Sequence, residues 1–322
     1  MKKNLVALPI FVLSLITWIY QSPNRDFNYI IKDYETNRIF LKDIKISIAP
    51  THISYKQFLI VLVTSYVGHV ELRSAHRRAM PQDLLKSMNA TRIFLLAHIP
   101  EKEKHIIKQE AINKESNLFG DILQGSFVEH YRNLTYKHLM GLRWASAACT
   151  KASYILKVDD DTVFNFDKTY KLLKSNISLD NSILGYMLND TRPKRNKENK
   201  WYVTWDEYPR SVYPSYVSGW YYVVTPKVAS RIVDEAIYHP YFWIDDVFVC
   251  DGFWLEHYEL LECCFRYMVQ KSIRCDHIVG PNGGKDNLIV EFNDAATRCD
   301  NWGNCSKQSE DALINSCLDS LA

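Results

Sequence analysis

The chain has 322 residues, enough for one large catalytic-sized domain with attachments or for two modest domains. Hydrophobic residues make up 47% of the chain and charged residues 24%, so it is neither a disordered chain nor a multispanning membrane protein. Lys and Arg number 39 against 37 Asp and Glu, and a net charge of +2 provides no field that would favour binding to nucleic acid.

A basic tail and an apolar segment open the chain. Residues 1–4 include two lysines, and residues 5–20 are apolar except for Pro9, Ser14 and Thr17. This pattern predicts a cytoplasmic tail over 1–4 and a short signal-anchor transmembrane helix over 5–20. A cleaved signal peptide is the alternative, although no small-x-small cleavage site follows the apolar run. Either way the rest of the chain enters the secretory lumen, with residues 21–54 as a stem.

Two further features agree with a lumenal location. Acceptor triplets for N-glycosylation begin at Asn89, Asn133, Asn176, Asn189 and Asn304. The cysteines are even in number and crowd toward the C-terminus: Cys149, Cys250, Cys263, Cys264, Cys275, Cys299, Cys305 and Cys317. In an oxidising compartment this favours disulfides, whose pairing the sequence leaves open, and the absence of paired CxxC motifs argues against zinc.

Continuous apolar runs alternate with helical stretches along the middle of the chain. The runs at 58–63, 92–97 and 153–158 predict strands that are buried on both faces of a mainly parallel sheet. Helices are expected over 71–88, with a break at Pro81, and over 131–148. The alternation predicts one α/β domain over 55–280, in which helices flank a central, mostly parallel twisted sheet.

Three consecutive aspartates, Asp159, Asp160 and Asp161, end the third predicted strand. Ligand sites in such sheets lie beyond the carboxyl ends of the strands. Adjacent carboxylates repel one another unless a cation gathers them, and hard oxygen ligands select Mn²⁺ or Mg²⁺. Such an ion would let the phosphates of a nucleotide act as a leaving group. A solvated surface charge run is the alternative, but the apolar neighbours Val158 and Val163 hold the triplet near the core.

Several motifs in order resemble the β-1,3-glycosyltransferase family that includes β-1,3-galactosyltransferases and β-1,3-N-acetylglucosaminyltransferases. The resemblance spans about Phe58 to Gly252. Its motifs are Arg73-Ser-Ala-His-Arg77, Phe119-Gly-Asp-Ile-Leu123, Phe127-Val-Glu-His-Tyr131, Asn133-Leu-Thr135, Lys157-Val-Asp-Asp-Asp161, Tyr213-Pro-Ser-Tyr216 with Ser218-Gly219, and Asp245-Asp246-Val247. It implies a GT-A-like nucleotide-sugar transferase fold with a UDP-sugar donor, Mn²⁺ or Mg²⁺, and a glycan acceptor on protein or lipid. It also implies a single-pass Golgi membrane protein whose catalytic domain is lumenal.

The resemblance assigns the chemistry to two acidic motifs. Asp246 is the expected general base for the acceptor hydroxyl, and Asp245 stands where the family has Glu, beside the substrate. Capping of a helix predicted over 247–262 is the alternative role for Asp246. Asp161 is the expected metal ligand, while Asp159 and Asp160 would meet ribose, sugar hydroxyls or metal-bound water.

Further residues are expected around the nucleotide and the sugar. Arg73 and Arg77 share a helical face and, with Asp121 and Lys157, are assigned to the nucleotide, against a solvated basic face or structural ion pairs as the alternative. His277, or else His257, is a candidate metal ligand. Trp220 and Trp243 would stack on a sugar or else pack in the core.

The expected activity is an inverting, metal-dependent transfer of a hexose or N-acetylhexosamine from a UDP-sugar, forming a β-1,3 linkage. The chain departs from the family where Ser218-Gly219-Trp220-Tyr221-Tyr222 replaces a glycine-rich segment, which predicts a bulkier acceptor wall. These departures leave open a catalytically inactive relative that binds carbohydrate or acts as a chaperone. Residues 281–322 form a cysteine-containing extension.

Overall fold

The computed structural model describes residues 43–51, 57–149, 151–175 and 179–250, together with the backbone of two short strands at 259–261 and 279–282. The predicted tail and anchor, both candidate histidines His257 and His277, and the cysteines after Cys250 lie outside these residues. No helix of the described part is long and apolar enough to cross a bilayer. Cys149 is a buried free thiol.

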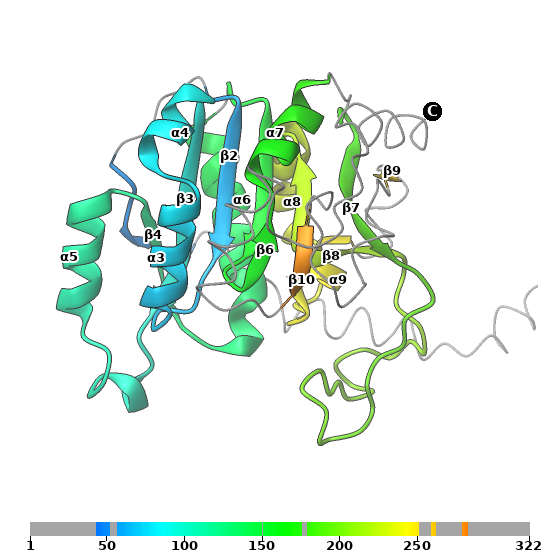
Figure 1. Cartoon of the computed structure of the whole chain (residues 1–322). Coiled ribbons are helices and arrows are strands. Elements are labelled where there is room, and N and C mark those ends of the chain that lie inside the picture. The colour runs from blue at the N-terminus through cyan, green and yellow to red at the C-terminus, as the bar shows by residue number, and fades with distance from the viewer. Residues whose placement is uncertain are drawn as a thin grey trace, which may run out of the picture.

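A mixed sheet of eight strands, in the order β1-β4-β3-β2-β5-β8-β7-β9, organises the described chain (Figure 1). Strands β4, β3, β2 and β5 run parallel, as do β7 and β9, whereas β1 and β8 run antiparallel to their neighbours. The strands are β1 (Ile46–Ile48), β2 (Leu59–Thr64), β3 (Ala90–His98), β4 (Ile122–Val128), β5 (Tyr154–Asp159), β7 (Ser182–Leu188), β8 (Tyr216–Val224) and β9 (Glu259–Leu261). Strands β6 (Thr162–Phe164) and β10 (Val279–Asn282) form a separate antiparallel pair.

The central strands are buried on both faces, as their unbroken apolar runs predict. In β2, Leu59, Val61 and Val63 pack in one hydrophobic cluster, and the alternate residues Ile60 and Leu62 pack in another. Side chains of successive strand residues point to opposite faces, so a strand covered on both sides has no polar face. The three predicted strands and the predicted α/β fold class are confirmed.

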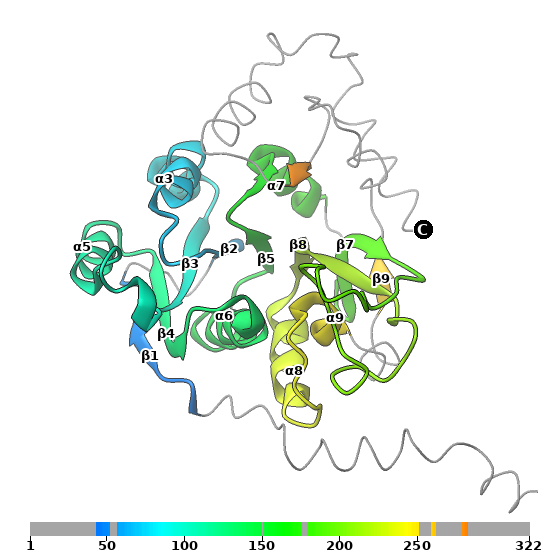
Figure 2. The same cartoon turned by 90° about the horizontal axis from the view of Figure 1, so that it is seen from below.

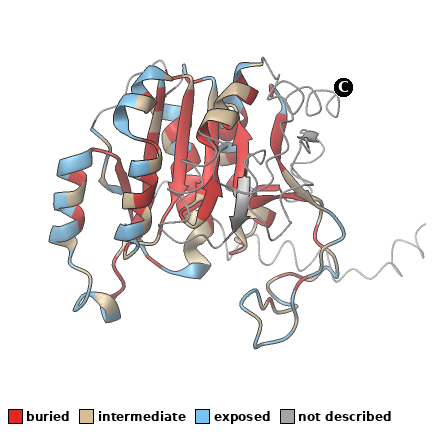
Figure 3. Ribbon diagram, viewed as in Figure 1, coloured by how far each residue is buried: buried red, intermediate tan, exposed pale blue. Residues whose placement is uncertain are grey.

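Helices cover both faces of the sheet. Figure 2 shows α3 and α7 on one side and α6 and α8 on the other. The helices are α3 (Val70–Ala79), α4 (Gln82–Ser87), α5 (Gln109–Phe119), α6 (Leu134–Ala148), α7 (Phe166–Lys174), α8 (Pro226–Ala236) and α9 (Asp245–Cys250). The burial pattern agrees, because the central strands β2, β3 and β5 are largely buried while the helices turn polar faces outward (Figure 3).

The helix predictions succeed in part. The break at Pro81 separates α3 from α4, because proline lacks the N–H that a continuing helix requires. The helix expected over 131–148 is α6, preceded by one 3-10 turn at Tyr131–Asn133. The helix expected over 247–262 is wrong at its far end, since Glu259–Leu261 is β9 and pairs with β7. A short apolar run has no period that distinguishes a helix from a strand.

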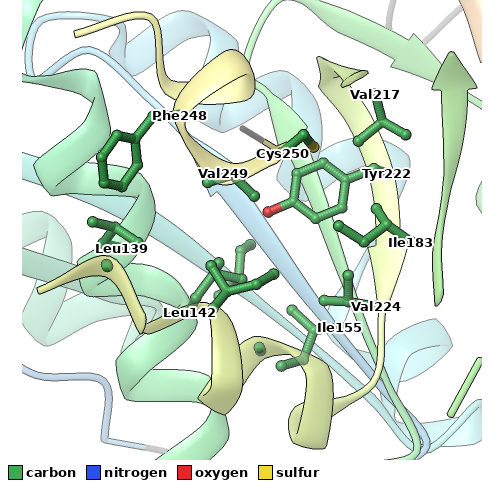
Figure 4. Packing of buried hydrophobic residues seen from close by; sticks show 14 of the residues in the cluster. Leu139, Leu142, Ile155, Ile183, Val217, Tyr222, Val224, Phe248, Val249 and Cys250 are labelled. Atoms are coloured by element: carbon green, nitrogen blue, oxygen red, sulfur yellow. The ribbon is translucent and has the colours of Figure 1, made fainter. Parts of the chain in front are cut away.

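The core between the sheet and helices α6, α8 and α9 is the larger of the two hydrophobic layers. It holds residues of all three helices and of the strands that they cover. Figure 4 shows part of it: Leu139 and Leu142 of α6, Phe248, Val249 and Cys250 of α9, and Ile155, Ile183, Val217, Tyr222 and Val224 of the sheet. This packing fixes the start of α9 against strand β8.

The sheet extends into the segment expected to be a stem, because Ile46–Ile48 pairs with β4 as strand β1. In the centre of the sheet, the parallel register of β2 and β5 places Thr64 opposite Asp159, so the two strands end at the same edge of the sheet. The long connection between β7 and β8, residues 189–215, extends away from that edge as the light-green loop in Figure 1. The shared edge of β2 and β5 and the connection between β7 and β8 border the site described next.

Candidate active site

A cavity of about 990 Å³ opens where strands β2 and β5 end. Its walls come from the segment after β2, the aspartates after β5, the connection after β7, strand β8 and the start of α9. In open α/β sheets, ligands bind at this end of the strands. The cavity brings together eight of the residues singled out from the sequence: Lys157, Asp159, Asp160, Asp161, Trp220, Trp243, Asp245 and Asp246.

The three consecutive aspartates have different surroundings. Asp159 accepts from the Lys157 ammonium at 2.8 Å. Asp160 is buried, and its carboxylate accepts from the backbone N–H of Tyr66 at 3.2 Å and lies 2.8 Å from Nδ1 of His69. Among the residues that the structure describes, no ion pair or side-chain hydrogen bond reaches the Asp161 carboxylate. The pKa of Asp161 is raised to about 6, mainly by burial and also by the charges of Asp159 and Asp160.

This arrangement fits a divalent cation that is completed by a ligand. Within the described ranges, no group of three or more His, Cys, Asp or Glu side chains is placed to hold a metal by itself. Asp161, however, is a hard oxygen donor without an ion-pair partner in these ranges and stands beside two further carboxylates, a setting that a cation would stabilise. A metal held by so few protein oxygens keeps positions for phosphate oxygens and water.

The first two residues of α9 are carboxylates with opposite pKa shifts. Asp245 lies 3.0 Å from Nδ1 of His138 and 3.7 Å from the Lys157 ammonium. Burial opposes the charge of Asp245, but Lys157 and His138 outweigh it and hold its pKa at about 2. Burial raises the pKa of Asp246 to about 7, with the charge of Asp245 acting in the same direction. Adjacent acids with separated pKa values are typical of sites that carry out proton transfer.

Backbone contacts fix the Asp246 carboxylate. One oxygen accepts from the N–H of Gly219 at 3.3 Å and the other from the N–H of Val247 at 2.9 Å. A Cβ atom added at Gly219 would lie 3.1 Å from the Cβ of Asp246, so a side chain there would crowd the carboxylate. The glycine kept within the otherwise bulky segment of β8 therefore allows α9 to approach the strand.

Lys157 links the two acidic motifs. Its buried ammonium donates to Asp159 and to the carbonyl of Gly219, and it faces Asp245. Burial alone would lower the pKa of Lys157, but the charges of Asp159 and Asp245 raise it, so the side chain stays protonated. The positive charge of Lys157 thus stabilises the negative charges of Asp159 and Asp245.

Three of the residues assigned to the nucleotide do not line the cavity. The buried guanidinium of Arg73 makes five hydrogen bonds, two to Glu115 and three to Ser65 and the backbone carbonyls of Tyr66 and Val67. Five bonds use every N–H that an arginine has. The assignment of Arg73 to the nucleotide therefore does not fit the structure. The Arg73 side chain instead holds the segment after β2, which forms part of the cavity wall.

Arg77 and Asp121 also belong to this buried network. Arg77 lies 2.7 Å from Glu115 and 2.7 Å from Asp121, and Arg92 lies 2.8 Å from the other oxygen of Asp121. Burial would raise the pKa of Asp121, but Arg77 and Arg92 outweigh it and lower the pKa below its ordinary value. Arg77 and Asp121 therefore form structural ion pairs, which is the alternative role given for them in the sequence analysis.

The two tryptophans differ in how their rings are placed. Trp220 lies half-buried in the cavity wall, with its ring centroid 6.2 Å from that of Tyr186. Trp243 is 5% exposed, and its ring lies 5.9 Å from that of Tyr131 and 4.5 Å from the Arg132 guanidinium. Core packing, the alternative for Trp243, is what the structure shows for most of its surface.

Sequence reasoning missed several residues of the cavity. His138 carries no sequence signal, because it stands on a helix among apolar residues and acts only through its contact with Asp245. Glu129 and Lys137 form a buried ion pair in the wall, and only Glu129 stands in a motif noted from the sequence, to which no role was given. His69 was also missed, since its contact with Asp160 joins residues that are far apart in the chain.

Comparisons with known proteins place the chain in context. A family model described as galactosyltransferase matches residues 72–262. The chain is 33% identical over 195 residues to beta-1,3-galactosyltransferase 1 of Homo sapiens, which covers 60% of this chain and 58% of that protein. It is 34% identical to beta-1,3-galactosyltransferase 2 of Homo sapiens over 195 residues, 60% of this chain and 46% of that protein. The chain therefore spans about half the length of these curated relatives.

Two solved structures match the chain at low sequence identity and low TM-score. The galactosyltransferase LgtC in complex with donor and acceptor sugar analogs is 10% identical with a TM-score of 0.33, over 63% of this chain and 72% of that chain. The mannosyltransferase PcManGT from Pyrobaculum calidifontis, in complex with GDP-Man and Mn²⁺, is 11% identical with a TM-score of 0.41, over 92% and 83%.

Proposed function

The chain belongs to the galactosyltransferase family, and from this premise we propose that it transfers a hexose or N-acetylhexosamine from a UDP-sugar to a hydroxyl of a glycan acceptor. The transfer inverts the anomeric carbon and forms a β-1,3 linkage. The observation that carries the proposal is the pair Asp245 and Asp246, one held ionised and the other with a pKa of about 7, at the wall of a cavity large enough for a nucleotide sugar.

The donor's diphosphate belongs at the end of β5. A divalent cation there, Mn²⁺ or Mg²⁺, would neutralise charge that develops on the departing diphosphate. Asp161 would hold it, because this carboxylate forms no ion pair with a cationic side chain among the described residues. Asp159 is held by Lys157, and Asp160 is held by Tyr66 and His69, so these two keep the turn in shape. The Lys157 charge offsets part of the negative charge that the donor brings.

Asp246 acts as the general base. In an inverting transfer the acceptor oxygen attacks the anomeric carbon from the face opposite the diphosphate and passes its proton to a base. The backbone N–H groups of Gly219 and Val247 orient the Asp246 carboxylate. Its pKa of about 7 makes it a stronger base than an ordinary aspartate, and it is still ionised in half or more of the molecules at neutral pH. The proton leaves the hydroxyl for Asp246 as the new glycosidic bond forms and the bond to the diphosphate breaks.

The location follows from the N-terminal pattern and the family. We propose a single-pass anchor over 5–20 and a lumenal catalytic domain in the Golgi. Support comes from the basic tail, the apolar run and the glycosylation triplets. This orientation is tested by protease protection of microsomes that contain the protein with an epitope at each end of the chain.

The activity is tested with the full chain purified in detergent. We expect it to release UDP from UDP-galactose or UDP-N-acetylglucosamine in the presence of Mn²⁺ and a panel of saccharide acceptors, and to lose this release in the variant Asp246→Asn. Asp167→Asn, on the exposed surface of α7, is the matched control and should keep full activity. Tight binding of UDP and Mn²⁺ with no turnover on any acceptor would instead support an inactive carbohydrate-binding relative.

A further inference from the structure

The connection between β7 and β8 is docked onto the start of α6. The indole N–H of Trp201 donates to the hydroxyl of Tyr131 at 2.9 Å. Arg132 forms an ion pair with Glu207 and donates to the carbonyl of Tyr202 at 3.3 Å. These contacts join the middle of the connection to the 3-10 turn that precedes α6.

The connection is also held from within. Arg195 donates to the carbonyls of Val203, Thr204, Tyr208 and Arg210 at 2.6 to 2.9 Å. One guanidinium thus fixes four points of the backbone, so the loop has a defined shape. Side chains that it directs into the cavity are placed in advance of any ligand.

Two exposed tryptophans of this loop differ in their surroundings. Trp201 is 48% exposed and lines the cavity. Trp205 is 58% exposed, does not line the cavity, and lies 3.9 Å from the Arg195 guanidinium. An exposed indole costs free energy in water, and at the wall of a cavity it offers a flat apolar surface to a ligand. Trp201 has the position for this role and Trp205 does not.

In the lining of the same cavity, two buried polar atoms have no partner among the described residues. They are the indole N–H of Trp243 and the hydroxyl of Tyr213, and both side chains line the cavity. Leaving a buried donor unpaired costs about 1–3 kcal/mol. Two such atoms in one wall point to a ligand with several hydroxyl or carbonyl groups.

These residues lie on the side of the cavity where Asp246 stands. Trp243 precedes Asp245 by two residues, and its ring centroid lies 5.9 Å from that of Tyr131. The pKa of Tyr131 is raised to about 12, mainly by burial and also by the charges of Asp245 and Asp246. The pKa of Tyr213 is likewise raised by burial, with a contribution from the Asp246 charge. The group nearest to Asp246 in the proposed reaction is the acceptor hydroxyl, not the nucleotide.

We propose that Trp201, Trp243 and Tyr213 form the subsite for the acceptor saccharide. The apolar face of a pyranose ring stacks on the Trp201 indole, while its hydroxyl or acetamido oxygens accept from the Trp243 N–H and the Tyr213 hydroxyl. Tyr131 is a positioning residue, because its hydroxyl anchors the Trp201 ring. This assignment rests on the proposed function, and it replaces stacking by hydrogen bonding as the role of Trp243.

The first experiment compares the two exposed tryptophans in the full chain. Binding of methyl β-N-acetylglucosaminide and methyl β-galactoside is measured by saturation-transfer NMR, which requires no turnover. We expect Trp201→Ala to weaken the binding of at least one glycoside by about tenfold, Trp201→Phe to keep most of it, and Trp205→Ala to leave it within about twofold. Equal effects of Trp201→Ala and Trp205→Ala, or binding of neither glycoside to the wild type, would overturn the assignment.

Donor binding separates this proposal from the proposed function. Titration with UDP and Mn²⁺ should give the same affinity for Trp201→Ala as for the wild type. A weaker affinity for UDP in Trp201→Ala would mean that Trp201 stacks on the uracil ring, and the acceptor assignment would be wrong while the transferase proposal stands. Saccharide binding without any UDP binding would contradict the transferase proposal and leave the subsite in place.

The second experiment removes the two unpaired polar atoms. Trp243→Phe and Tyr213→Phe keep an aromatic ring and delete the N–H or O–H group. For Tyr213→Phe we expect unchanged or increased thermal stability, because an unpaired buried hydroxyl is lost, together with about fivefold to tenfold weaker glycoside binding. A purely structural role would move stability and leave glycoside binding unchanged, and that result would contradict the proposal.

Discussion

The molecule contains two groups of buried charges that differ in how their charges are matched. In the network beside α5, Glu115 accepts from Arg73 and Arg77, and Asp121 accepts from Arg77 and Arg92. Every carboxylate there has two guanidinium partners. The pKa values of Glu115 and Asp121 lie below their ordinary values, because the arginines outweigh the effect of burial.

Two carboxylates of the cavity, Asp161 and Asp246, have the opposite balance. Asp161 and Asp246 are paired with no cationic side chain in the described part of the chain, and their pKa values are raised to about 6 and about 7. Asp245, by contrast, is kept ionised by Lys157 and His138. Carboxylates that are paired with arginines therefore stabilise the fold. Asp161 and Asp246, which have no cationic partner among the described residues, remain available to bind a cation and to accept a proton.

The largest expected effect comes from removing the base. Asp246→Asn should lower kcat by about 10²–10⁴-fold, because the acceptor hydroxyl loses its proton acceptor. It should also be more stable than the wild type at pH 8, since the wild type must ionise a buried carboxylate whose pKa is raised in the folded state. Steady-state kinetics and thermal unfolding on the same preparations provide the measurement. A variant that loses both activity and stability would mean that Asp246 belongs with the framework.

Removing a carboxylate charge from the buried network of arginines and acids beside α5 should lower the stability of the fold. Glu115→Gln leaves two buried guanidinium groups short of charge, and we expect it to destabilise the fold by about 3–5 kcal/mol. Its exposed neighbour on α5, Glu110→Gln, is the control and should change stability by less than about 0.5 kcal/mol. The free energy of unfolding in urea provides the measurement.

The pH dependence of this stabilisation has a defined sign. The pKa of Glu115 is lowered in the folded protein, so its contribution is fully present above its ordinary pKa of 4.5 and is lost as the pH falls through the lowered value. The destabilisation by Glu115→Gln should therefore shrink in acid. An unchanged difference between wild type and variant from pH 7 down to pH 3 would contradict the role given to this carboxylate.

Removal of the unpaired carboxylate of the triplet should act on donor binding. Asp161→Asn is expected to weaken the Mn²⁺-dependent binding of UDP by at least about 10–100-fold, the loss typical of removing even an outer partner of a metal. Calorimetric titration of UDP with Mn²⁺, and again with EDTA, measures it, and Asp167→Asn serves as the control. Equal UDP affinity with and without Mn²⁺ in the wild type would remove the cation from the account.

A smaller effect is expected from the neighbour of the base. Asp245→Asn removes a negative charge that raises the pKa of Asp246, so the acidic limb of the rate profile should move to lower pH. His138 and Lys157 lose a partner in this variant, and some loss of activity at all pH values is expected as well. A limb that stays in place would show that Asp245 does not tune Asp246.

The sequence predicts the framework of the site well because its signals are local. Continuous apolar runs identify β2, β3 and β5, and the aspartates directly after β5 must lie at the carboxyl edge of the sheet. The motif at Asp245 and Asp246 could be assigned from the resemblance. The register that brings Thr64 opposite Asp159 then follows from parallel pairing.

Contacts between distant segments could not be predicted in the same way. The spacing of Arg73 and Arg77 places both on one face of a helix, but nothing in it identifies Glu115 as their partner, so they were assigned to the nucleotide. His138 meets Asp245 across more than a hundred residues, and Trp201 meets Tyr131 across seventy. Such pairs depend on tertiary packing.

The pH dependence of kcat/KM for the wild-type full chain tests the central claim most directly. An uncompensated, buried Asp246 that acts as the base predicts an acidic limb centred near pH 7, with kcat/KM falling about tenfold per pH unit below it. A limb centred near pH 4, where an ordinary aspartate titrates, or a limb that persists in Asp246→Asn, would contradict the account.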